Sequence, residues 1–169
     1  MSLIRASYTV HRGQAYAGQI ADTSLYNIDG ACVASAKFAI GKLVCVEQVQ
    51  SVEGHKVVSV AKDATKPILG VAVMSHAYSP TGEYEEGVAV NVMTHGRVWA
   101  LVKADGFTDA DAGFDKAVSF NAEGVIDKAG TIKTGYTFTG EVLPTTDAKY
   151  KIAKIQLIQS AKAPAATGG

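Results

Sequence analysis

The chain has 169 residues, of which 47% are hydrophobic and 19% are charged, and its 16 Lys and Arg residues balance 16 Asp and Glu residues. This length suits one domain, with or without an arm, and a zero net charge argues against nucleic acid as the main partner, because phosphate binding needs an excess of positive charge. No apolar run reaches the roughly 18 residues that span a bilayer, and the N-terminus lacks the apolar region of a signal peptide, so we expect no membrane segment and residence in a cytoplasm.

The first 30 residues form a polar leader that contains tyrosines and glycines but no helical apolar stripe and no clean strand alternation along its length. A segment with aromatic anchors and little capacity to form a core usually becomes ordered by lying on another surface. We therefore expect residues 1–30 to be an extended arm that crosses a neighbouring subunit, with Tyr8, Arg12 and Tyr16 as its anchors. Alternatively, residues 16–20 add an edge strand to the body of their own chain.

The next segments predict β-strands. Residues 38–46 are rich in β-forming residues, the β signal continues toward Val52, Glu53-Gly54 supplies a turn, and residues 56–60 return, so this region predicts a hairpin. Residues 68–74 form a continuous apolar run of strand length, which indicates a central buried strand.

The clearest alternation lies at residues 88–93, where three valines share one face, and a second strand is predicted at residues 97–102. Gly96 between them either closes a tight hairpin or marks a bulge in one long strand. Further strands are predicted at residues 117–120, 125–126, 136–143 and 151–158, and one helical turn at about residues 108–114. The side chains predicted to be largely buried are those of Val71, Val73, Val90, Val92, Val98, Leu101, Ile155 and Leu157.

Many short strands with glycine-rich turns and almost no helix indicate an all-β fold, a β-sandwich or barrel that is jelly-roll-like. We expect the extended N-terminal arm to cover residues 1–30, the β-domain residues 31–160, and a flexible C-terminal tail residues 161–169. Cys32 and Cys45 lie in apolar surroundings and are expected to be buried, without a disulfide.

No motif in the chain carries recognisable chemistry. The histidines His11, His55, His76 and His95 are dispersed, and no C-x-x-C pair, nucleophile elbow, P-loop or dinucleotide motif is present. The acidic residues between Asp109 and Asp115 depart from a calcium loop and are expected to cap a turn. We therefore expect neither a catalytic set nor a metal or other cofactor.

Trp99 is the only tryptophan, and Arg97 shares its strand face. Core packing is one interpretation of Trp99, and an Arg–Trp interaction hot spot is the other. The residues that we expect to contact a partner are therefore in the arm and on this face, together with one loop tyrosine: Arg5, Tyr8, His11, Arg12, Tyr16, Tyr84, Arg97 and Trp99.

Several motifs, taken in order, resemble the structural cement proteins of tailed bacteriophage heads. These motifs are Ala17-Gly18-x-x-Ala21-Asp22, Leu69-Gly70-Val71-Ala72, Tyr84-x-x-Gly87-x-x-Val90-x-Val92-x-x-x-Gly96-x-Val98-Trp99 and Ile152-Ala153-x-Ile155-x-Leu157. Each is degenerate alone, but their order and spacing cover the chain from about Gly13 to Ile158.

The resemblance implies a non-enzymatic β-protein on the outer surface of the virion capsid, assembled in the host cytoplasm. It also implies a homo-dimer or homo-trimer that cements adjacent major capsid protein subunits. A competing hypothesis is a carbohydrate-binding β-sandwich module, either free or on a virion surface, with Tyr78, Tyr84 and Trp99 as exposed aromatic residues. Where these aromatic side chains lie distinguishes the two hypotheses.

Overall fold

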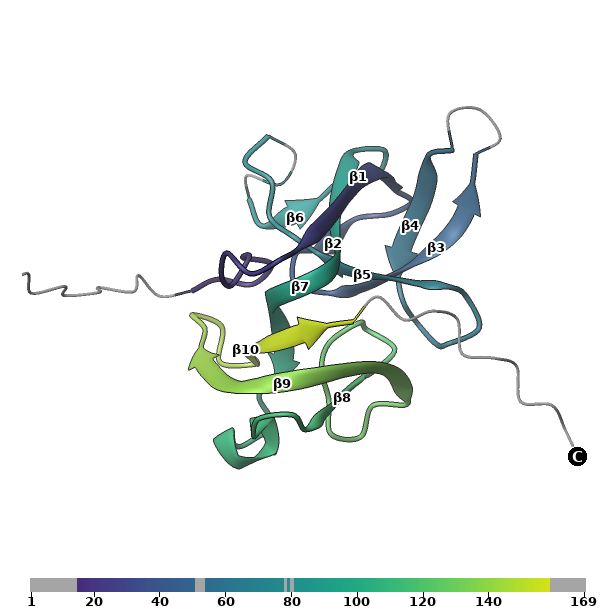
Figure 1. The fold of residues 1–169 in the computed structure, drawn as a ribbon. Coiled ribbons are helices and arrows are strands. Elements are labelled where there is room, and N and C mark those ends of the chain that lie inside the picture. Colours follow the sequence, from purple (N-terminus) through teal and green to yellow (C-terminus); the bar gives the residue numbers. More distant parts are fainter. Residues whose placement is uncertain (1–14, 51–53, 78, 80, 159–169) are drawn as a thin grey trace, which may run out of the picture.

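The computed structural model describes residues 15–50, 54–77, 79 and 81–158, and these residues form an almost entirely β structure (Figure 1). One short 3-10 helix, η1 (Asp109–Ala112), lies in the predicted helical turn. The all-β prediction is therefore confirmed. The strands are β1 (Asn27–Ala34), β2 (Phe38–Ala39), β3 (Leu43–Val49), β4 (Lys56–Val60), β5 (Ile68–Ala72), β6 (Glu83–Tyr84), β7 (Ala89–Lys103), β8 (Ala117–Phe120), β9 (Ile132–Pro144) and β10 (Tyr150–Leu157).

Five strands close into a ring in the order β1-β4-β3-β5-β7, because β1 pairs with β4 on one side and with β7 on the other. The β1–β4 pair is parallel and the other four pairs are antiparallel. A ring this small is filled by its own side chains. Every strand of the ring contributes to one buried cluster, which contains Cys32, Ala34, Val44, Val58, Ala72, Val90 and Val92, with Phe38, Ile40 and Tyr84 from outside the ring.

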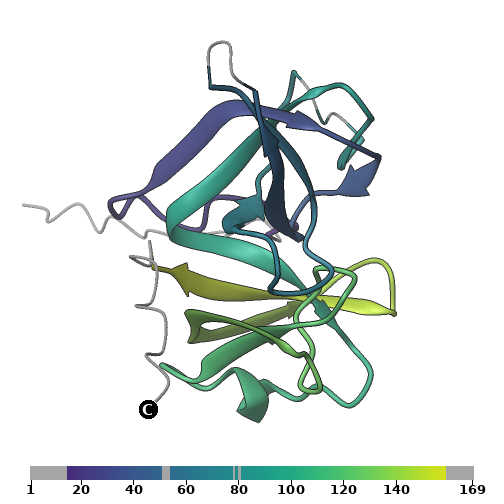
Figure 2. The ribbon, with the colours of Figure 1, turned by 90° about the vertical axis from the view of Figure 1, so that its right-hand side faces the viewer.

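β7 continues out of this ring and joins the two halves of the molecule, which lie one above the other in Figure 2. Its first half pairs with β1 and β5, and its second half, from Gly96 onward, pairs with β10. Gly96 has a φ of +106°, and a Cβ there would lie 2.5 Å from the Cβ of Tyr26. Gly96 therefore lies inside one long strand, and the hairpin alternative is wrong because β7 runs through this residue without a turn.

The second half of the molecule is the sheet β7-β10-β9-β8. Among the described residues, its far side is connected back to β7 by single bridges of Ile126, which pairs with Val102 and with Phe120. The largest buried cluster fills this half and also contacts the outside of the ring, since it includes Leu43, Val71 and Met93 of the ring together with residues such as Phe120, Phe138, Ile155 and Leu157. The two halves thus share one core.

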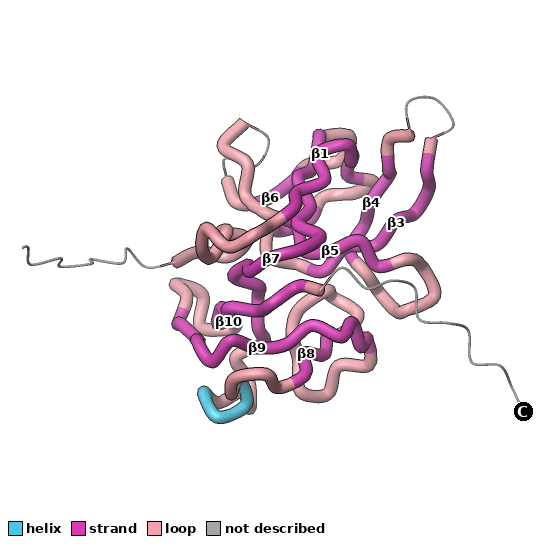
Figure 3. Tube along the Cα trace, viewed as in Figure 1, coloured by secondary structure: helices cyan, strands magenta, loops and turns pink. Residues whose placement is uncertain are grey.

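Most predicted elements are present. The β3–β4 hairpin is confirmed, and all eight side chains predicted to be buried are buried. Residues 38–46 differ, because Gly41 adopts φ +78° and separates β2 from β3. Cys32 and Cys45 are buried and unbridged, as expected. Figure 3 shows how far strands outweigh helix, and no helix in the part of the chain that the structure describes is long and apolar enough to cross a membrane.

Candidate functional site

The described residues contain no arrangement suited to metal binding. No group of three His, Cys, Asp or Glu side chains lies together there. His55, His76 and His95 belong to three different segments, namely the β3–β4 loop, the stretch after β5 and strand β7, and His11 lies outside the described residues. The acidic residues near η1 instead cap a turn: Asp111 accepts hydrogen bonds from the backbone N–H and the hydroxyl of Thr108, at 2.7 and 2.8 Å.

Tyr84 is not available to a partner, so its prediction as a contact residue is wrong. It is fully buried, its hydroxyl donates to the carbonyl of Val73 at 2.6 Å, and the N–H of Asn91 donates to that hydroxyl. Its ring packs on Phe38 with 5.8 Å between ring centroids. Tyr84 thus seals one end of the five-stranded ring, and burial raises the pKa of its phenol.

Trp99 is also a core residue, which decides between the two interpretations left open by the sequence. Its side chain is 6% exposed and belongs to a third buried cluster with Leu101, Val125 and Ile152. This cluster lies on the other side of the β7–β10 sheet from the main core, and Ala15, Ala17 and Ala21 pack against it. The prediction that Trp99 contacts another molecule is wrong, because residues of its own chain cover this side chain.

Residues 15–22 form the segment that covers Trp99, and we call it the strap. The N–H of Gly18 donates to the carbonyl of Trp99 at 2.7 Å, and Ile20 forms an antiparallel bridge with Val98. Gly18 adopts φ +72°, and a Cβ there would lie 2.9 Å from Ile40. The strap therefore lies on the body of its own chain, as the edge-strand alternative predicted.

The side chain of Arg97 contacts the strap through Asp22 and remains partly exposed to solvent. Its Nη1 lies 3.1 Å from Oδ2 of Asp22, and its Nε donates to Gln156 at 3.0 Å. Burial would raise the pKa of Asp22, but hydrogen bonds from Ser24 and Arg97 outweigh it and hold that pKa below its usual value. Arg97 and Trp99 share a face as predicted, and their common task inside this chain is to hold the strap.

Because of these contacts, the folded body begins closer to the N-terminus than the sequence predicts. β1 begins at Asn27, so the boundary expected at residue 30 falls inside a strand of the ring. Arg5, Tyr8, His11 and Arg12 lie outside the described residues. Tyr16, at the start of the strap, is 44% exposed and is the one predicted arm anchor within the described part of the chain.

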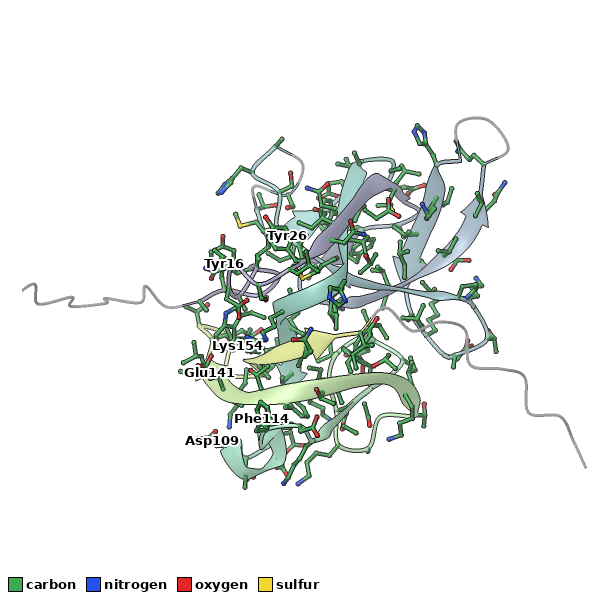
Figure 4. The ribbon with its side chains drawn as sticks, viewed as in Figure 1. Tyr16, Tyr26, Asp109, Phe114, Glu141 and Lys154 are labelled. Carbon is green, nitrogen blue, oxygen red and sulfur yellow. The ribbon has the colours of Figure 1, made fainter. Side chains whose placement is uncertain are left out.

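Two grooves flank the start of the strap, and Ala15 borders both. The first has a volume of about 750 Å³ and lies between the strap and residues 140–143 of β9, with Trp99, Asp109 and Lys154 also lining it. The second has a volume of about 580 Å³ and runs beside Tyr16 and the turn between β9 and β10, residues 144–147. Figure 4 shows Tyr16, Glu141 and Lys154 on this side of the molecule.

Sequence reasoning missed several exposed apolar side chains. Leu25 is 84% exposed, Phe114 is 80% exposed, and Tyr26 lies beside Gly96. Phe114 directly follows the acidic turn, in a loop where a large aromatic side chain is not expected to be buried. This position in the sequence could have predicted its exposure. Tyr16, Tyr26 and Phe114 are labelled in Figure 4.

Comparisons with known proteins agree with one another. A family model described as "Structural cement protein (E217 gp24/Pam3 gp6)" matches residues 4–158. A chain in the solved capsid of Myoviridae phage XM1 has the same fold, with a TM-score of 0.56 and 18% identity over 85% of this chain and 90% of that chain. A search of curated proteins found no match.

Proposed function

The chain belongs to the structural cement protein family and is a capsid-stabilising protein of a bacteriophage virion, and on this premise we propose that it binds the outer surface of the shell and cements adjacent major capsid protein subunits. The observation that carries this proposal is the family match over residues 4–158, which includes both halves of the body, the strap and most of the arm. The likeness to a phage capsid chain supports the fold on which the function depends.

The proposed partners are the major capsid protein and further copies of this chain, as a homo-dimer or homo-trimer. A zero net charge supports protein partners over nucleic acid, and a low charge content favours self-association. We propose no catalytic activity. The surfaces available for these contacts include Tyr16 and the open part of Arg97, and we assign the arm residues Arg5, Tyr8, His11 and Arg12 to the same role.

The carbohydrate-binding alternative is not favoured. It needs exposed aromatic side chains on an open face, and both Tyr84 and Trp99 are buried, while Tyr78 lies outside the described residues. The aromatic side chains exposed in the described part, such as Tyr16, Tyr26 and Phe114, come from separate segments, the first from the strap, the second from just before β1 and the third from the loop after η1.

Binding to capsids tests the proposal. Purified protein is mixed with expanded capsids that lack it, and the mixture is sedimented and then heated. We expect co-sedimentation at a fixed stoichiometry and a higher temperature of capsid disruption. Absence of binding to such capsids would contradict the proposal.

Deletion of residues 2–12 tests the arm separately. Because the described body begins at residue 15, we expect the shortened chain to keep its circular dichroism spectrum and melting temperature but to protect capsids less. Equal protection by the shortened and full chains would remove the arm from the mechanism while leaving capsid binding by the body intact.

A further inference from the structure

Phe114 is the most exposed aromatic side chain in the described part of the chain, at 80%, and it lies in the loop between η1 and β8. The loop itself is packed on the body, since Ala112 is fully buried in the main core. A single exposed apolar side chain is common on protein surfaces. Phe114 differs from the common case in the backbone that holds it and in the charges beside it.

The backbone on the C-terminal side of Phe114 is fixed to β9. The N–H of Asp115 donates to the carbonyl of Phe138, and the N–H of Phe138 donates to the carbonyl of Lys116, both at 2.9 Å. Asp115 adopts φ +64° and is the one non-glycine residue with a positive φ among the described residues. Few side chains accept this conformation, and Asp and Asn accept it best. Phe114 is therefore followed directly by a residue in a constrained conformation.

The backbone on the N-terminal side of Phe114 is fixed as well. Asp111 accepts hydrogen bonds from the N–H and the hydroxyl of Thr108, and Nζ of Lys116 donates to a carbonyl of η1 at 2.7 Å. The N–H of Lys116 donates to the carbonyl of Gly113 at 3.1 Å, which closes the turn that carries Phe114. A side chain presented by a fixed loop loses less conformational entropy on binding than one on a mobile loop.

The charges beside Phe114 are mainly negative. Residues 109–116 contain Asp109, Asp111 and Asp115 but only one basic residue, Lys116. Asp111 pairs with Lys128 at 3.1 Å, whereas neither Asp109 nor Asp115 has an ion pair within the part of the chain that the structure describes. Figure 4 shows Asp109 and Phe114 in the same lower part of the molecule. Two carboxylates thus remain available close in sequence to an exposed aromatic ring.

These charges indicate the kind of surface that would accept Phe114. An apolar pocket complements it best when basic groups at the rim face the carboxylates. The two grooves beside the strap do not offer this: the 580 Å³ groove is lined by Asp147 and by no basic residue, and the 750 Å³ groove by two acidic residues and one lysine. A second copy of this chain is therefore a poor acceptor at these grooves, and another protein is favoured.

We propose that Phe114 is an anchor that enters an apolar pocket on the major capsid protein, with basic side chains of that pocket facing Asp109 and Asp115. This inference rests on the proposed function and adds to it a contact surface outside the N-terminal arm. Aromatic side chains that fill a pocket of the partner commonly carry a large share of the binding energy of an interface.

Alanine substitution tests the anchor. Capsids that lack the protein are titrated with the parent, with Phe114→Ala and with Leu25→Ala, and bound protein is measured after sedimentation. Leu25 is the matched control, because its side chain is 84% exposed and lies before β1. We expect Phe114→Ala to weaken binding about tenfold or more and Leu25→Ala to change it by less than about twofold. Both side chains are in solvent, so both variants should keep the melting temperature of the parent.

The outcomes of this titration separate the anchor from the proposed function. A parent that does not bind capsids would overturn both. A parent that binds while Phe114→Ala binds equally well would overturn the anchor alone, and so would an equal loss in Phe114→Ala and Leu25→Ala. If Phe114→Ala weakens self-association in sedimentation equilibrium and leaves capsid binding unchanged, the acceptor is a second copy and the assignment to the capsid protein is wrong.

Removal of the two carboxylates tests the basic rim. Asparagine also accepts the left-handed backbone, so Asp115→Asn removes the charge and preserves the loop. Combined with Asp109→Asn, it should weaken capsid binding at low salt and make the binding depend less on NaCl concentration than that of the parent. Equal affinity and equal salt dependence of the parent and this double variant would contradict a basic rim.

Photo-crosslinking identifies the acceptor directly. The photoreactive aromatic residue p-benzoylphenylalanine is placed at position 114, and in a second protein at position 25, and capsids decorated with each protein are irradiated. We expect position 114 to link to the major capsid protein, at a site whose neighbouring residues are basic, and position 25 to give little of that product. A link from position 114 to another copy of this chain, or equal yields from the two positions, would contradict the proposal.

Discussion

The two halves of the molecule manage their strand edges differently. In the half built from β1, β3, β4, β5 and the start of β7, each strand pairs on both sides and the ring has no open edge. In the described part of the other half, the sheet β7-β10-β9-β8 is connected back through single bridges of Ile126, and the last part of β9 has β10 as its strand partner and η1 beside it. Closure is the most complete protection of a sheet against unintended pairing.

This difference separates the part that supplies rigidity from the part that can still bind. The ring is filled by residues from all of its strands and is sealed by Tyr84, so little remains there for another chain to join. The open half carries the groove, the strap and the exposed Phe114. Under the proposed function, rigidity and binding would be divided between the two halves, which β7 joins.

The largest expected effect tests whether the halves fold as one unit. Leu157 of β10 is fully buried in the cluster that contacts both the ring and the open half. Leu157→Ala should lower the free energy of unfolding by about 2–5 kcal/mol, because it deletes buried methyl groups and leaves a cavity. Since the cluster is shared, denaturant unfolding followed by fluorescence and by circular dichroism should remain a single coincident transition.

Val49→Ala is the control, because Val49 is a 59% exposed strand residue and its truncation should change the free energy of unfolding by less than about 0.5 kcal/mol. Two separated transitions for Leu157→Ala would show that the ring survives alone, and the shared core would then contribute less than its contacts indicate.

The next effect concerns the seal of the ring. Tyr84→Phe removes a hydroxyl that accepts from Asn91 and donates to Val73, and it leaves these two backbone groups buried without that partner. The expected cost is about 1–3 kcal/mol in the free energy of unfolding, measured by urea titration. Tyr16→Phe changes the same atom on an exposed ring and should have no measurable effect. A cost below that of Tyr16→Phe would mean that the hydroxyl does not hold the ring closed.

A smaller effect concerns the strap, which covers the open half. Asp22 and Arg97 form an ion pair that is partly solvated, so their coupling in a double-mutant cycle of Asp22→Asn and Arg97→Gln should be about 0.2–1 kcal/mol. The local consequence should be clearer than the global one. Amide exchange at Gly18 and Ala21, which donate to β7, should become faster in either variant, while amides of the ring stay unchanged. Faster exchange throughout the ring would contradict a local role.

Much of the fold follows from local patterns. Alternation at residues 88–93 and 153–157 identifies the strands and their buried faces, because one residue of slip would place Val90 or Ile155 in solvent. The closure of the ring could not be read in this way, since the parallel pairing of β1 with β4 joins segments that no turn connects. For the same reason the sequence places residues 27–30 in the arm, although they are the first residues of β1.

The site was harder to predict than the fold. The sequence predicts Tyr84 as a contact residue and leaves Trp99 open between core and interface, but burial is decided by what the topology places over them, β2 in one case and the strap in the other. Arg97 was placed on the correct face because strand periodicity determines it.

The smallest expected effect is a pH dependence confined to the open half. Hydrogen bonds from the N–H and the hydroxyl of Thr108, together with Lys128 at 3.1 Å, lower the pKa of Asp111 to about 2. A pKa below the usual 3.8 means that the ionised carboxylate stabilises the folded state above about pH 4 and that this contribution is lost as the pH falls toward 2.

Asp111→Asn should therefore be less stable than the parent at pH 5, and the difference between the two should shrink as the pH falls below about 4 and vanish below about pH 2. Because Asp111 is at the surface, the difference should be small in global melts and should appear mainly as faster amide exchange around η1. The parent will also lose stability in acid through other carboxylates, such as Asp22 and Asp29, whose pKa values are lowered as well. The informative quantity is consequently the parent-minus-variant difference in stability at each pH.

If this difference were constant from pH 5 to pH 2, the capping contact would not be electrostatic. If faster amide exchange appeared equally in the ring, the effect of Asp111 would not be confined to the open half.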